Sequence, residues 1–161
     1  MNLHLGKVSG HVRFVCERDG QVVDQFERPN LILNNLQRQL LRALIGQGGV
    51  TNYQISYVEY GANPQAPAVT DPGVLLSVID GSAAKTEAAI NPALSQKVGL
   101  YGLTVVSVLG PTQGVGSTYN EYALCLANNY GLSRQVFLTP RVKTAGETWT
   151  LSWTLTFNPP A

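Results

Sequence analysis

The stretch that decides the fold is residues 147–157, which read ETWTLSWTLTF. Every second position in it is apolar, and these positions are Trp149, Leu151, Trp153, Leu155 and Phe157. Because successive side chains of a β-strand point to opposite faces, this period of two predicts a strand inside a large antiparallel sheet. Its other face carries hydroxyls, which fit a surface that is partly wet or that meets another subunit. The predicted contact residues on that face are Thr148, Thr150, Thr154 and Thr156.

The composition predicts one domain over residues 1–161 with a partly covered surface. A chain of 161 residues has room for a single substantial core. Charged residues make up only 13%, which is about half of the usual share in soluble domains. This deficit indicates that other protein covers some of the surface, although a secreted β-protein with a polar uncharged surface would give the same count.

Charge and hydropathy argue against two classes of partner. The formal net charge is +1, with eleven basic and ten acidic residues, so no electrostatic footprint for nucleic acid or an anionic membrane is present. No apolar run approaches the roughly 20 residues that span a bilayer. Residues 1–7 lack a basic segment followed by an apolar block, so we expect no signal peptide and synthesis in a cytoplasm.

A hairpin and a helix are predicted in the first third of the chain. Strand-like runs flank Asp19-Gly20, which is a strong hairpin signal, and Pro29-Asn30 interrupts the second run. Asn34 or Asn35 is then a suitable N-cap, and Gly46 supplies the stop. The predicted helix, residues 35–45, buries the apolar positions Leu36, Leu40, Leu41, Leu44 and Ile45. Its opposite face is predicted to meet solvent through Arg38, Gln39 and Arg42.

The rest of the chain predicts more strands and one long loop. Strands are expected at residues 54–60, 99–108, 119–127 and 134–138, the last one closed by Pro140, whereas residues 74–80 and 83–89 are ambiguous. Residues 62–72 form a proline-rich loop, which is either a plain surface connection or an arm that lies along a neighbour. Its predicted contact residues are Pro64, Pro67 and Pro72. With about eight strands, the fold class is mainly β, an antiparallel β-sandwich or jelly roll with one short amphipathic helix.

No residue pattern predicts catalysis, a cofactor or a metal. His4 and His11 lack ligand-type neighbours at metal spacing, and Cys16 and Cys125 are expected to be buried thiols. Residues 82–85 match Ser-x-x-Lys without its companion motifs, and residues 110–116 are glycine-rich without a phosphate-loop lysine. Paired carboxylates are available in principle, but nothing singles out two of Glu59, Asp71, Asp80, Glu87, Glu121 and Glu147. The seven tyrosines would suit sugar stacking, but packing within β-sheets explains them more simply.

Three stretches together resemble small virion structural proteins of tailed bacteriophages. The first is Asn-Leu-Ile-Leu-Asn at residues 30–34, which leads into the leucine-rich helix. The second is Tyr-Val-Glu-Tyr-Gly at residues 57–61, which precedes the proline-rich loop. The third is Leu-Ser-Arg at residues 132–134, which is followed by Pro140, Lys143 and the final Trp-x-Leu-x-Phe strand.

The resemblance implies an assembly role without catalysis. It implies a protein made in the bacterial host cytoplasm and located in the virion, where it decorates or cements the capsid or attaches to the tail. The implied partners are the major capsid protein or another virion protein, together with copies of the chain itself in a symmetric dimer or trimer. A carbohydrate-binding β-sandwich on a tail fibre or secreted enzyme is the alternative, and a small hydrolase is the least favoured.

Overall fold

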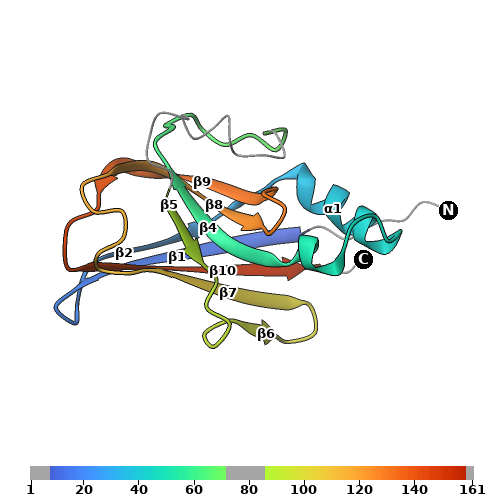
Figure 1. The fold of residues 1–161 in the computed structure, drawn as a ribbon, viewed down its shortest axis with the longest axis horizontal. Helices are drawn as coiled ribbons and strands as arrows, with labels where there is room; N and C mark the ends of the chain where they lie inside the picture. Colours follow the sequence, from blue (N-terminus) through green and yellow to red (C-terminus); the bar gives the residue numbers. More distant parts are fainter. Residues whose placement is uncertain (1–7, 72–85, 159–161) are drawn as a thin grey trace.

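The computed structural model describes residues 8–71 and 86–158, which form two facing antiparallel sheets (Figure 1). Sheet A has the strand order β2-β1-β10-β7-β6, comprising β2 (Gln21–Pro29), β1 (Val8–Arg18), β10 (Glu147–Phe157), β7 (Gly102–Leu109) and β6 (Gln96–Val98). Sheet B has the order β3-β9-β8-β4-β5, comprising β3 (Leu31–Ile32), β9 (Gly131–Val142), β8 (Thr118–Leu126), β4 (Ile55–Gly61) and β5 (Thr86–Ala89). Helix α1 (Asn34–Leu44) and the short 3₁₀ helix η1 (Val50–Tyr53) lie at one end. The predicted β-sandwich is confirmed, and its jelly-roll variant stays a prediction.

Strand β10 is the centre of sheet A, as its length and alternation predict. It pairs over its whole length with β1 on one side, and its residues 149–156 pair with β7 on the other. Its four central apolar residues are buried, at 2% exposure or less: Trp149, Leu151, Trp153 and Leu155. The hydroxyl residues between them are half-buried on the outer face of the sheet. The inner face of β10 therefore forms part of the core, and its outer face forms the middle of the outer surface of sheet A.

The core between the sheets is rich in aromatic rings. Trp149 of sheet A packs edge-on against Phe14, with a centroid distance of 5.4 Å, and against Tyr119 of sheet B at 5.7 Å. Tyr122 contacts Trp153 at 5.5 Å in the same manner. Edge-to-face pairs of this kind add about 0.5–1.5 kcal/mol each to the apolar burial. The buried rings of the two sheets therefore interlock and fix how the sheets face each other.

The early turns follow the sequence signals. Asp19 and Gly20 have φ angles of 53° and 75°, the two positive values that a tight type I′ hairpin turn requires. Strand β2 ends at Pro29, and the chain then moves to sheet B as β3. At the crossing, the amide of Asn30 donates to the carbonyl oxygen of Gly10 at 3.0 Å. The Pro29-Asn30 interruption is thus the point where the chain changes sheets.

Two strand predictions need correction. Pro140 does not end the fourth predicted strand, because β9 continues to Val142. In the pairing with β8, Val136 lies opposite Glu121, and the next paired residue of β9, Arg141, lies opposite Tyr119. Pro140 therefore lies in a bulge, where its lack of an amide hydrogen breaks no hydrogen bond of the sheet. The predicted strand at 99–108 is β7, which begins only at Gly102, because residues 99–101 form the turn of the β6–β7 hairpin and Gly99 has a φ of 60°. Residues 74–80 and 83–85 lie outside the described residues.

Helix α1 exists where the sequence places it, but the predicted buried face is wrong. Leu36 and Gln39 are buried, at 5% and 2% exposure, and Leu40 is half-buried. Leu41, Leu44 and Ile45 are instead 47%, 73% and 69% exposed. Gln39, which the amphipathic pattern assigned to solvent, is therefore inside.

The contacts at the helix N-terminus explain this rotation. The N-cap is Leu33, which makes no side-chain cap, so neither predicted asparagine has that role. The amide of Leu33 donates to the Leu132 carbonyl at 2.9 Å, and that of Asn34 donates to the Val69 carbonyl at 3.1 Å. At 3.6 residues per turn, the buried side of the helix, which carries Asn35, Leu36 and Gln39, is roughly a third of a turn away from the centre of its apolar stripe. The sandwich fixes the helix through these backbone bonds, and part of the stripe stays outside.

Candidate functional site

The predicted hydroxyl surface forms as a continuous face on the outside of sheet A. Thr148, Thr150, Thr154 and Thr156 are all half-buried there, in the middle strand. Thr154 also hydrogen-bonds Thr104 of β7, with an Oγ1–Oγ1 distance of 2.9 Å. Every side chain that β10 contributes to this face is neutral, and charged side chains lie beside them on the neighbouring strand β1. Such a strip can contact another protein surface without a charge being desolvated.

The other predicted contact region lies on the opposite side of the sandwich. Residues 62–71 run along the outside of sheet B (Figure 1), where Pro64 is exposed and Pro67 is half-buried. Pro72 lies outside the described residues. The structure therefore does not bring the loop and the threonine face into one site. They are two separate candidate surfaces, one on each sheet.

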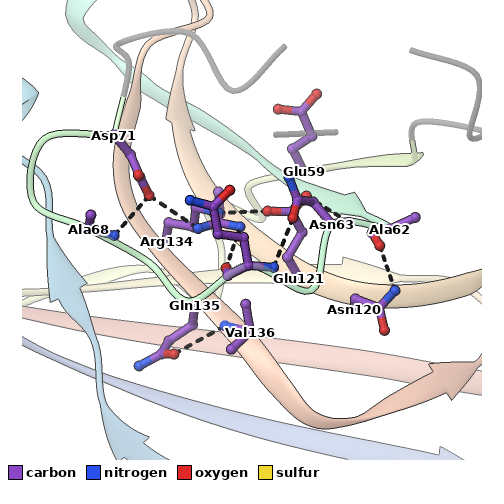
Figure 2. Close-up of polar contacts among 12 residues, drawn as sticks. Glu59, Ala62, Asn63, Ala68, Asp71, Asn120, Glu121, Arg134, Gln135 and Val136 are labelled. Carbon is purple, nitrogen blue, oxygen red and sulfur yellow. Dashed lines mark hydrogen bonds and ion pairs between the residues drawn. The ribbon is translucent and has the colours of Figure 1, made fainter. Parts of the chain in front are cut away.

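A buried arginine ties this loop to sheet B, as Figure 2 shows. Arg134 of β9 is 1% exposed, and its Nε donates to Oε2 of Glu121 at 2.6 Å. Its Nη1 donates to Oδ2 of Asp71 at 3.1 Å, and its Nη2 donates to the carbonyl of Gln65 at 2.9 Å. The other oxygen of Glu121 accepts the Asn63 amide at 3.2 Å. The loop is thus held at three points and is not a free arm.

Burial sets the ionisation of this network. Burial raises the pKa of Glu121 to about 7, although the Arg134 guanidinium and the Asn63 amide lower it and the nearby Glu59 raises it. Arg134 also pairs with Asp71, and the effect of burial on Glu121 is larger than that of the guanidinium. Glu121 consequently titrates near neutral pH inside the protein.

The network collects three of the carboxylates that the sequence could not rank. Asp71 and Glu121 pair with Arg134, and Glu59 lies near enough to Glu121 to raise its pKa, whereas Glu87 is on the edge strand β5 and Asp80 lies outside the described residues. Glu59 and Glu121 are only 3% and 1% exposed, so a substrate in solution has no access to them. This arrangement is suited to fastening a loop. The sequence signal that marks it is an arginine that lies between apolar and small polar residues near the start of β9.

A second ion pair lies at the far end of the sandwich. Glu147 accepts hydrogen bonds from Arg18 at 2.6 Å, from the Thr144 amide at 3.1 Å and from Trp149 Nε1 at 3.2 Å. Burial alone would raise the pKa of Glu147, but these hydrogen bonds lower it to about 2. Its side chain fixes the turn before β10, which is a structural role.

Large apolar side chains project from both ends of the molecule. At the helix end they are Leu44 and, on the turn between β6 and β7, Leu100, which are 73% and 78% exposed. At the opposite end, Leu138 in the bulge of β9 is 89% exposed. That bulge lies beside the β1–β2 hairpin, because Thr139 and Val23 line the same surface cavity. The sequence pattern did not identify these residues as exposed, because it assigned Leu100 and Leu138 to strands and Leu44 to the buried face of the helix.

The remaining predicted features are structurally modest. The side chains of Cys16 and Cys125 are buried, as expected. His11 pairs with Glu27 through an Nδ1–Oε1 contact of 2.7 Å on the outside of sheet A, and His4 is not described. In the described ranges, no group of three or more His, Cys, Asp or Glu side chains is arranged to hold a metal ion. In the same ranges, no helix has the length and apolar character needed to cross a bilayer.

Comparisons with protein-family models, with curated proteins and with solved structures find no match to this chain.

Proposed function

We propose that this protein is a structural component of a tailed-bacteriophage particle, bound to the outside of the capsid. In this role it has no catalytic activity, and it stabilises the shell by bridging neighbouring subunits of the major capsid protein. The phage resemblance of the sequence supplies the class of particle. The exposed apolar side chains at the two ends of the sandwich supply the means of attachment.

The observation that carries the proposal is the presence of apolar projections at opposite ends. Leu100 and Leu44 lie at the helix end, and Leu138 lies at the end of the β1–β2 hairpin. Burying one such leucine contributes about 1.5–3 kcal/mol relative to leaving it exposed. Two separate apolar ends can contact two different shell subunits, which is what bridging requires. Linkage then favours the assembled shell, because the bridge does not form on free subunits.

Low net charge predicts how this attachment responds to salt. With a net charge of +1, the protein gains little from long-range attraction to the particle. Binding that rests on shape and apolar contact should change little between low and high ionic strength. A steep loss of binding with salt would instead indicate a charged contact surface.

The test is particle stability with and without the protein. Particles that lack the protein should release their genome at lower temperature or weaker osmotic shock, and purified protein added back should restore resistance. Leu100→Ser should weaken restoration, whereas Lys97→Ser, on the same exposed hairpin, should leave it unchanged. Equal robustness of the two kinds of particle would contradict the proposal.

The alternative is a carbohydrate-binding role on the tail. Four of the seven tyrosines are buried, namely Tyr57, Tyr60, Tyr119 and Tyr122, which removes most of the aromatic surface that this role would use. The observation in its favour is a polar depression near the end of α1 that Tyr53 and Tyr130 line together with amide side chains. Saturable binding of host glycans, or location of the protein at the tail tip, would favour this alternative.

A further inference from the structure

A cavity of about 190 Å³ lies between helix α1 and the end of the sandwich. Its inner wall consists of leucines from four different elements, all 5% exposed or less: Leu36, Leu126, Leu132 and Leu155. Ala43 is exposed, and Leu40 and Tyr53 are half-buried, so the cavity reaches the surface along the helix. The displaced apolar stripe of α1 borders this mouth, because Leu44 lies one turn after Leu40 on the same side of the helix.

The size and lining of the cavity define what fits in it. An apolar cavity of about 150 Å³ lined by leucine, isoleucine and phenylalanine stays dry and accepts a benzene-sized molecule. This cavity is slightly larger and has the same kind of lining, with no charged side chain among the residues that line it. It therefore suits one neutral apolar group, either an aromatic ring or a branched aliphatic chain.

Gln39 adds a polar requirement to this apolar wall. The side chain is 2% exposed, and neither its Nε2 nor its Oε1 has a hydrogen-bond partner in the part of the chain that the structure describes. A buried amide without partners destabilises a protein, so an occupant that offers both a donor and an acceptor is favoured here. A peptide group offers both, is neutral and has the size of the Gln39 amide itself.

We propose that this cavity is a socket for one apolar side chain of a partner protein, whose adjoining peptide group pairs with the Gln39 amide. The apolar side chain fills the leucine-lined space, and the peptide group meets Gln39 beside it. The exposed leucines of the helix then extend the apolar contact around the mouth. The choice of a virion protein as partner rests on the proposed function, whereas the chemistry of the socket does not.

The chemistry is tested with three small compounds in an NMR titration of the full-length protein. N-acetylphenylalaninamide carries both the ring and peptide groups, toluene carries only the ring, and N-acetylglycinamide carries only peptide groups. We expect saturable shifts of the Leu36, Leu126 and Leu132 methyl signals with the first two compounds and none with the third. The pairing with Gln39 should make the first compound bind about threefold to tenfold more tightly than toluene.

Two variants with matched controls assign the binding to the socket. Gln39→Leu should still bind toluene but lose the preference for the amide compound, whereas Gln37→Leu, on the exposed side of the same helix, should keep it. Ala43→Trp should close the mouth and abolish binding of both compounds. Arg38→Trp, also exposed on α1, should have no effect. Absence of saturable binding, or binding that Ala43→Trp leaves intact, would overturn the socket.

A particle assay separates the socket from the proposed function. If Ala43→Trp weakens attachment to particles that lack the protein and Arg38→Trp does not, the partner's side chain occupies the socket on the particle. Full attachment of Ala43→Trp would overturn the virion protein as the partner of the socket. Failure of the unaltered protein to attach would overturn the capsid function, while the compound titrations would still decide the chemistry of the socket.

Discussion

At the scale of single residues, the buried guanidinium of Arg134 organises one whole side of the molecule. It connects β9 to β8 through Glu121 and connects both strands to the loop through Asp71 and the Gln65 carbonyl. A buried charge is tolerated only where its donors are used, and removing one partner of such a pair costs about 3–5 kcal/mol. Arg134 therefore holds the loop in place.

The ionisation of Glu121 makes a prediction about pH. Its pKa in the folded protein is about 7, whereas its ordinary value is 4.5, so the folded state binds the proton more tightly than the unfolded state. Stability should therefore fall as pH rises from about 4.5 to about 7, where the ionised carboxylate is buried. Glu121→Gln resembles the protonated form and should lose this slope, a difference of about 3 kcal/mol between pH 4 and pH 8.

Urea unfolding of both proteins across this pH range checks the prediction. Glu87→Gln is the matched control, because it removes an exposed carboxylate from the edge strand of the same sheet and should keep the slope. Carbon-13 NMR of the Glu121 carboxyl group reports its titration directly. A midpoint near pH 4 for Glu121, or parallel stability curves for the unaltered protein and Glu121→Gln, would show that Arg134 fully compensates the carboxylate.

At the scale of elements, helix α1 shows that packing decides which side of an amphipathic helix is buried. Leu36 is 5% exposed and packs against Leu126 and Leu132, whereas Leu44 is 73% exposed. We predict that Leu36→Ala lowers the free energy of unfolding by about 2–5 kcal/mol. Leu44→Ala should change it by less than about 0.5 kcal/mol, as is usual for surface substitutions.

Denaturant unfolding of the two leucine variants, on the same helix and with the same atoms removed, gives a direct comparison. Leu40→Ala should fall between them, since Leu40 is half-buried. Equal losses for Leu36→Ala and Leu44→Ala would mean that the helix is rotated toward the face that the apolar pattern predicts.

The same elements show which parts of the fold a sequence can predict. The strand at 119–127, the alternation in β10 and the Asp19-Gly20 turn follow from local patterns, and the structure confirms all three. The rotation of α1 depends on backbone bonds from Leu33 and Asn34 to distant residues, which no local period reveals. The Arg134 network likewise joins residues 63 positions apart in the case of Asp71. Local chemistry predicts the strands, whereas long-range contacts fix the helix face and the buried ions.

At the scale of the whole molecule, the two sheets present different outer surfaces. Sheet B has its outer face crossed by residues 62–71, which are fastened by Arg134 (Figures 1 and 2). Sheet A offers the half-buried threonines of β10 across its middle. The apolar projections lie at the ends. A second copy that packs on sheet A would therefore leave both apolar ends available for a larger partner.

We predict that the protein self-associates as a symmetric dimer or trimer through this threonine face. In a twofold dimer the same patch faces itself across the axis, so one substitution places two new charges opposite each other. Thr150→Glu and Thr154→Glu should therefore weaken association strongly, since both residues lie at the middle of the central strand of sheet A. Thr51→Glu adds the same charge at an exposed site in η1 and should leave association unchanged. Sedimentation velocity at high micromolar concentration measures the difference, and an unaltered protein that stays monomeric there would contradict self-association while leaving particle attachment to its own test.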